Sequence, residues 1–458
     1  MGLSGGPNGA KAVFVETFSN AFKDLKTLKS VRELVGVDRS QTLVVMDGNV
    51  MMNAIPASVY TFSGYVSILS HQINEAIQAA EHVVVVFDEP AAITTAKSNE
   101  QRRRDASRKA RVPLCSSDLV ASITDDNFTT EMLSAEGCNT KLLMEHRNAR
   151  PRFFDAMCVA LMHKFKSKMI GGKWSLTFDG IDSRGADRAF GATRNAGILS
   201  SGQEFWNSLL HREHPIGEGD IKLTEVTQRV HEAAGVEGTP VHGVCLNLVV
   251  TIDTDSFAIE MLQQDDRQNR KSTEDQNELT ILCLKERARK RKGDDFITDA
   301  HYLCCDMQVF HSSILDYFYG SKSLSQEVKN RQSAALALLA VSIACCGCDF
   351  IEVKGMRVDL VLPVVRNVVR LHPEKLDPLV SMRKKESRPL LLQGTETVEF
   401  LISEYVASLA GVPRMQRAKA SASNSCDAQI LRALWTCAYW HQHELKNCAE
   451  WGFGAASG

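Results

Sequence analysis

The sequence lacks any apolar run of the roughly 20 residues that a membrane-spanning helix requires. Its first residues lack the basic flank and apolar stretch of a secretory signal, and Gly6 stands where a myristoylation signal requires serine or threonine. The formal net charge is only −2, which gives no overall indication of a polyanionic partner. We therefore expect no membrane partner, and the cysteine usage fits a reducing compartment inside the cell, the cytoplasm or the nucleus.

Two widespread classes of binding motif are also missing. The 13 cysteines include no two C-x-x-C sequences at zinc-like spacing from each other, and Cys345, Cys346 and Cys348 lie in an apolar run, which favours reduced core residues over metal ligands. No Walker A sequence occurs, which disfavours a P-loop ATPase or helicase. With 44% hydrophobic and 24% charged residues, the composition is that of an ordinary globular protein, and 458 residues allow two or three domains.

Short runs rich in β-branched residues predict an α/β fold. Residues 42–46 and 82–87 are too short for helices, and each run directly precedes an aspartate, whereas residues 58–80 between them have helical periodicity. A third strand is expected over residues 244–252. Strand, helix and strand in succession indicate a mainly parallel central sheet flanked by helices.

Composition divides the chain into four parts. Residues 1–125 and 216–370 carry the expected strands, and residues 126–215 between them are interpreted as an insertion because of their glycine and polar clusters. Residues 371–458 are predicted to form a mostly helical C-terminal region. Residues 263–279 are polar and charged, so we expect a flexible loop there.

Acidic residues follow all three expected strands. Asp47 and Asp88 directly follow the first two, and Asp253 and Asp255 follow the third at a spacing that puts both on one face of an extended chain. In a parallel sheet these strand ends meet at one edge, where ligands bind. A single such aspartate is usually a turn former or a helix cap, but the repetition favours a site.

Two further acidic residues, Glu218 and Asp220, flank Gly219 where the chain is expected to enter a helix, and a helix N-terminus favours negative charge. Carboxylates gathered in this number raise each other's pKa unless cations lie between them. Mg²⁺ prefers such hard oxygen ligands, and two ions about 3.5–4 Å apart stabilise an in-line phosphoryl displacement. The sequence therefore predicts a site for two Mg²⁺ ions, with Mn²⁺ as a substitute.

The motifs around these residues resemble those of the flap endonuclease/XPG/Xrn superfamily of PIN-like 5′ nucleases. The similar segments are VVMDGN, VVVFDEP, GEGD, TIDTDS and GCDF, in the family's order. The resemblance implies an α/β nuclease core that hydrolyses phosphodiester bonds near the 5′ end of RNA or DNA. It also implies that seven acidic residues form the metal site: Asp47, Asp88, Glu218, Asp220, Asp253, Asp255 and Asp349.

Residues 97–111 are strongly basic, and Lys97 and Arg104 are two helical turns apart, so they share a face of the expected helix. The resemblance implies a catalytic role for this pair, which would stabilise charge on the phosphoryl oxygens. A solvated charged face is the alternative interpretation. The resemblance further implies that a second group binds substrate: Gln101, Arg103, Lys222 and Gly355.

Several segments favour the Xrn-type 5′→3′ exoribonucleases. AKSNEQRRR, GEGDIK and GCDFI are similar to exoribonuclease motifs, with Gln101 and Arg104 in a pocket for a 5′ phosphate, although Asn53 replaces the histidine that would stack on the first base. VKGMR at residues 353–357 is weakly similar to the helix–two-turn–helix of the flap endonucleases, which are the alternative. The non-enzymatic alternative is an inactive nuclease-like subunit that binds nucleic acid or serves in assembly. The sequence predicts no particular protein partner.

Overall fold

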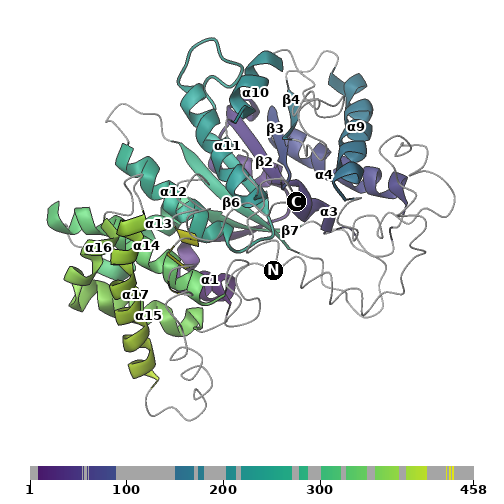
Figure 1. Cartoon of the computed structure of the whole chain (residues 1–458). Coiled ribbons are helices and arrows are strands. Elements are labelled where there is room, and N and C mark those ends of the chain that lie inside the picture. The colour runs from purple at the N-terminus through teal and green to yellow at the C-terminus, as the bar shows by residue number, and fades with distance from the viewer. Residues whose placement is uncertain are drawn as a thin grey trace, which may run out of the picture.

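A seven-stranded sheet forms the centre of the computed structural model (Figure 1). Its strands lie in the order β1–β7–β6–β5–β2–β3–β4. Neighbours from β6 to β4 are parallel, whereas β7 is antiparallel to both β6 and β1. The fold is therefore α/β with a mostly parallel sheet. The strands are β1 (Phe22–Leu25), β2 (Thr42–Asp47), β3 (His82–Val86), β4 (Ser175–Asp179), β5 (Leu246–Thr251), β6 (Leu279–Glu286) and β7 (His301–Asp306).

The structure describes most, but not all, of the chain. The described residues are 9–53, 55, 59, 61–88, 150–169, 174–179, 203–212, 218–270, 278–286, 301–320, 326–347, 356–380, 388–409, 430, 433, 434, 436 and 437. Within them, the three strands predicted from β-branched runs are confirmed, as β2, β3 and β5, to within two residues at each end.

Helices cover both faces of the sheet (Figure 1). They are α1 (Ala10–Thr17), α2 (Leu28–Val35), α3 (Gly48–Asn53), α4 (Phe62–Ala79), α9 (Arg150–Met169), α10 (Gln203–Leu210), α11 (Gly219–Ala234), α12 (Ser256–Arg270), α13 (Met307–Tyr319), α14 (Gln326–Cys345), α15 (Val358–Leu371), α16 (Asp377–Val380) and α17 (Arg388–Ser408). Short 3₁₀ turns occur at Ser19–Ala21, Arg39–Gln41 and Pro373–Leu376. None of the helices in these described ranges is both long and apolar enough to cross a membrane.

Side chains of the central strands alternate between two hydrophobic cores. In β2, Leu43 and Val45 enter the core formed with α1 and α10 to α17, whereas Val44 and Met46 enter the core formed with α2, α3, α4 and α9. Burial on both faces explains why the strand sequences are continuous apolar runs rather than alternating ones. It also fixes which side of the sheet each strand-end residue faces.

The helix expected over residues 58–80 is α4, and its start has a local cause. The Thr61 side chain accepts a hydrogen bond from the Gly64 amide at 3.2 Å, which satisfies one of the free N–H groups of the first turn. The C-terminal region is also helical where it is described, and α14, α15, α16 and α17 pack together beside α12 and α13 (Figure 1).

The prediction of a loop over residues 263–279 is wrong for the first half of this range. Helix α12 continues to Arg270, and Gln263, Gln264 and Asp265 are buried despite their polarity. Arg267 is buried in the same helix, and its guanidinium donates hydrogen bonds to Thr280 at 2.7 Å and Thr227 at 3.2 Å. Polar residues that find partners inside the protein give the same local pattern as a solvated loop.

Residues 126–215, interpreted as an insertion, contribute α9, β4 and α10 to the described structure. Strand β4 pairs with β3 along its whole length, and Phe153 of α9 packs against Tyr65 of α4 with ring centroids 5.6 Å apart. This stretch therefore supplies an edge strand of the central sheet and part of one hydrophobic core.

Candidate active site

Asp47 and Asp88 lie at the carboxyl ends of neighbouring parallel strands. Asp47 is in register with Val86, so Asp88 lies two residues further along the adjacent strand and faces the same side. That side is covered by α11, because Val45 and Val86 belong to the core that α11 helps to form. Asp47 is only 5% exposed, so its carboxylate is nearly removed from water.

The first turn of α11 closes over these two aspartates. The Gly219 amide donates a hydrogen bond of 2.7 Å to Oδ1 of Asp88. A Cβ at position 219 would lie 3.1 Å from Oδ1 of Asp88 and 3.6 Å from Oδ1 of Asp47, so glycine allows the backbone to approach both carboxylates. Glu218 and Asp220 flank this glycine and are therefore held at the same sheet edge.

The turn between β5 and α12 brings the next pair of acidic residues. The Asp255 amide donates to Oδ1 of Asp253 at 3.3 Å, which shapes the turn. The Ser256 hydroxyl donates to Oδ1 of Asp220 at 3.2 Å, which joins the start of α12 to the start of α11. Six of the seven acidic residues singled out in the sequence thus lie at one edge of the sheet: Asp47, Asp88, Glu218, Asp220, Asp253 and Asp255.

The electrostatics of this edge are unfavourable to bare carboxylates. Burial raises the pKa of Asp47 from 3.8 to about 8, and the charges of Asp88 and Asp253 act in the same direction. Hydrogen bonds from the backbone amides of Val50 and Asn49 oppose the increase without cancelling it. A positive charge at this edge would relieve the repulsion.

The donor set fits a hard divalent cation, since all six candidate ligands are carboxylates. In the described residues, however, no group of three or more histidine, cysteine, aspartate or glutamate side chains is arranged closely enough to hold a metal ion. The seventh acidic residue, Asp349, lies outside the described residues, as do the predicted phosphate-contacting and substrate-binding residues Lys97, Gln101, Arg103, Arg104 and Gly355.

A further strand-end carboxylate, Asp179, was missed in the sequence. It ends β4 and is in register with Val86, so β2 and β4 both place an aspartate at this level of the sheet, on either side of β3. The sequence signal was present, since Ser175–Asp179 is a short strand-like run that ends in aspartate. Glycine and polar clusters surround this run, so composition favours an insertion there rather than a strand of the sheet.

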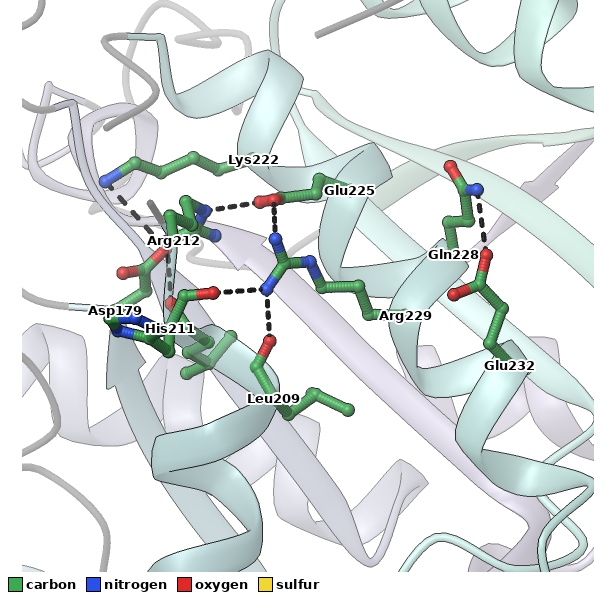
Figure 2. A network of polar contacts seen from close by, with 10 residues as sticks. Asp179, Leu209, His211, Arg212, Lys222, Glu225, Gln228, Arg229 and Glu232 are labelled. Carbon is green, nitrogen blue, oxygen red and sulfur yellow. Dashed lines mark hydrogen bonds and ion pairs between the residues drawn. The ribbon is translucent and has the colours of Figure 1, made fainter. Parts of the chain in front are cut away.

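Asp179 does not face open solvent but takes part in a buried ionic network (Figure 2). Arg212 Nη1 lies 2.8 Å from Oδ2 of Asp179, and its Nε donates to Glu225 Oε2 at 2.5 Å. Lys222, which was predicted to bind substrate, is only 1% exposed, and its Nζ lies 3.8 Å from Oδ2 of Asp179. Its substrate role stays a prediction.

No protein-family model and no curated protein matches this chain. The functional interpretation therefore rests on the residues and geometry of the site.

Proposed function

We propose that this protein is a divalent-metal-dependent 5′ nuclease of the PIN-like type, which hydrolyses phosphodiester bonds in nucleic acid. The observation that carries the proposal is the meeting of Asp47 and Asp88 with the Glu218–Asp220 turn at the carboxyl edge of a parallel sheet. Residues from three separate parts of the sequence converge there, and the sheet edge is where α/β folds bind their ligands.

A purely structural explanation accounts for only part of this arrangement. Asp47 does accept the Val50 amide at 3.1 Å, as a residue that caps a short helix would. A cap needs one carboxylate or amide oxygen, however, and gains nothing from the nearby Asp88 and Asp253, which raise the pKa of Asp47 beyond the effect of burial. Repulsion of this kind is typical of sites that bind cations.

In the proposed mechanism, the carboxylates of Asp47, Asp88 and Asp253, with those flanking Gly219, would hold the cations. Two bound ions would activate a water molecule and stabilise charge on the attacking and leaving oxygens of the phosphoryl transfer. Lys97 and Arg104, by the family resemblance, would contact the scissile phosphate and stabilise the charge that develops on its oxygens.

The motif similarities favour 5′→3′ exonuclease activity of the exoribonuclease type, with a flap or structure-specific DNA endonuclease as the second candidate. The first candidate needs a pocket for a terminal 5′ phosphate, which the resemblance assigns to Gln101 and Arg104. The second needs a grip on duplex backbone, which the weak VKGMR similarity around Gly355 would supply. The two candidates differ in the substrate end that they require, so a substrate panel separates them.

The test is an incubation of the full chain with Mg²⁺ or Mn²⁺ and end-labelled RNA and DNA: 5′-phosphorylated single strands, 5′-hydroxyl strands and 5′ flaps. Stepwise degradation of 5′-phosphorylated RNA, with the 5′-hydroxyl form spared, is the expected result. Single cuts at the base of DNA flaps would instead establish the endonuclease. Binding of these strands without cleavage in either metal would overturn the enzymatic proposal and favour an inactive nucleic-acid-binding subunit.

A further inference from the structure

A buried ionic network connects the β4 edge of the sheet to α11 (Figure 2). Arg212, just after α10, contacts both Asp179 of β4 and Glu225 of α11. Glu225 also pairs with Arg229 one turn further along α11, at 2.7 Å. The Arg229 guanidinium in turn donates to the carbonyl oxygens of Leu209 at 2.6 Å and His211 at 2.7 Å. The Arg212 guanidinium thus links α11 to β4, and the Arg229 guanidinium links α11 to α10.

The network is buried where it meets β4. The side chains of Asp179 and Arg212 are each 3% exposed, and Glu225 is 10% exposed. Burial lowers the pKa of Arg212, but the adjacent carboxylates of Asp179 and Glu225 more than reverse this effect and raise it overall. An arginine fork that bridges two carboxylates has a fixed geometry, so it constrains the relative positions of the elements that carry them.

The helix that this network holds is the one whose N-terminus enters the candidate site. Lys222 and Glu225 lie in the first two turns of α11, immediately after Glu218 and Asp220. The opposite side of α11 is fastened to α12, because the Thr224 hydroxyl donates to Oε1 of the buried Glu260 at 2.6 Å. The N-terminal half of α11 is therefore held from both sides, one turn beyond the point where Gly219 meets Asp88.

We infer that Asp179, Arg212 and Glu225 are positioning residues, which set the place of the first turn of α11 and thereby the affinity of the acidic edge for divalent cations. The inference rests on the proposed function, since it assigns these residues to the same metal site. It also gives Asp179 of β4 and Arg212, just after α10, a role in that site, although both come from the stretch interpreted as an insertion. None of the three residues needs to touch metal or nucleic acid, because each acts through α11.

The experiment compares Asp179→Asn with Glu232→Gln in the full chain. Asp179→Asn keeps the shape of the side chain but leaves the buried Arg212 with one carboxylate fewer. Glu232→Gln is the matched control, because it also removes one carboxylate charge from α11, at an exposed side chain near the end of the helix that accepts a hydrogen bond from Gln228 at 3.0 Å. If Asp179→Asn does not fold, Glu225→Gln replaces it, since the amide oxygen can still accept from Arg212.

Two readouts separate positioning from folding. Electron paramagnetic resonance with Mn²⁺ alone measures metal affinity, which we expect to fall about 10- to 100-fold in Asp179→Asn and to stay unchanged in Glu232→Gln, as is usual when a supporting contact behind metal ligands is lost. Hydrogen–deuterium exchange should accelerate over residues 218–226 in Asp179→Asn, while residues 62–79 of α4 exchange as in the wild type.

The outcomes distinguish the two proposals. Wild-type protein that binds no Mn²⁺ would overturn the metal site, and the exchange measurement would then still decide whether the network positions α11. Wild-type protein that binds Mn²⁺, together with an Asp179→Asn variant unchanged in both affinity and exchange, would overturn the positioning role alone. Faster exchange throughout the chain would also overturn it, because the network would then support general stability rather than the first turn of α11.

Discussion

Replacement of Asp47 by asparagine tests whether the acidic edge is built to bind cations or merely to cap a helix. Asparagine has nearly the shape of aspartate and is an equally good cap, so the hydrogen bond from the Val50 amide can be retained. What the replacement removes is a buried ionisable group whose charged form is unfavourable beside Asp88 and Asp253. We expect the variant to be more stable than the wild type when no divalent cation is present.

The magnitude follows from the pKa of Asp47, which burial and neighbouring charges raise from 3.8 to about 8. A carboxylate whose pKa is raised in the folded state contributes stability that is complete below its unfolded pKa and is lost as the pH rises through its folded pKa. At about 1.4 kcal/mol for each pKa unit, the wild type gives up roughly 4 kcal/mol by pH 7. With the cap retained the gain on replacement is therefore about 4 kcal/mol, and complete loss of the cap would reduce it to about 3 kcal/mol.

The assay is urea unfolding of both proteins at pH 7, first in a chelator and then in increasing Mg²⁺. The wild type should gain about 2.7 kcal/mol when Mg²⁺ reaches 100 times its dissociation constant, whereas the Asp47→Asn variant should gain much less. An asparagine variant that is less stable than the wild type in the chelator, or that gains equally from Mg²⁺, would refute the reasoning and return Asp47 to a capping role.

Three further predictions follow from single residues. Gly219→Ala puts a methyl group 3.1 Å from Oδ1 of Asp88, so Mn²⁺ binding measured by calorimetry should weaken, while the free energy of unfolding changes by less than about 1 kcal/mol. An unchanged Mn²⁺ affinity would mean that the methyl group does not disturb the carboxylates. Burial lowers the pKa of His82 from 6.5 to about 4, so the stability that this residue contributes is lost as the pH falls. In denaturant titrations the wild type should therefore lose about 1.5 kcal/mol relative to His82→Gln between pH 6.5 and 5, and parallel pH profiles of the two proteins would contradict this assignment. Phe310→Ala removes a fully buried ring that packs edge-on against Phe14, with ring centroids 5.3 Å apart. The free energy of unfolding, measured in urea, should fall by about 3–5 kcal/mol, and a fall of less than about 1 kcal/mol would mean that the aromatic cluster repacks.

The sheet and the acidic edge could be predicted because their signals are local. A β-branched run such as residues 82–87 favours a strand wherever it occurs, and in a parallel sheet the residue after the run falls at the ligand-binding edge. The gathering of several acidic residues at one edge of the sheet could therefore be predicted without knowledge of the packing. These residues are Asp47, Asp88, Asp253 and the pair Glu218 and Asp220.

The ionic network and the polar part of α12 could not be predicted because their causes are distant in sequence. Arg212 is buried only because Asp179, 33 residues earlier, and Glu225, 13 residues later, meet it in space. Asp265 is buried beside His311, whose Nε2 lies 3.3 Å from its Oδ1 across 46 residues. Charged and polar residues without such partners would stay in solvent, so composition alone predicts exposure.

The most direct test of the proposed function is single-turnover cleavage of a 5′-phosphorylated RNA in Mg²⁺ by the wild type and by Asp253→Asn, with both proteins at concentrations that saturate the RNA. Affinity for the same RNA is measured in parallel, without metal. The proposal predicts that the wild type cleaves, and that Asp253→Asn binds the RNA nearly as well but loses most of its turnover. Equal cleavage by both proteins, or none by the wild type in either Mg²⁺ or Mn²⁺, would contradict it.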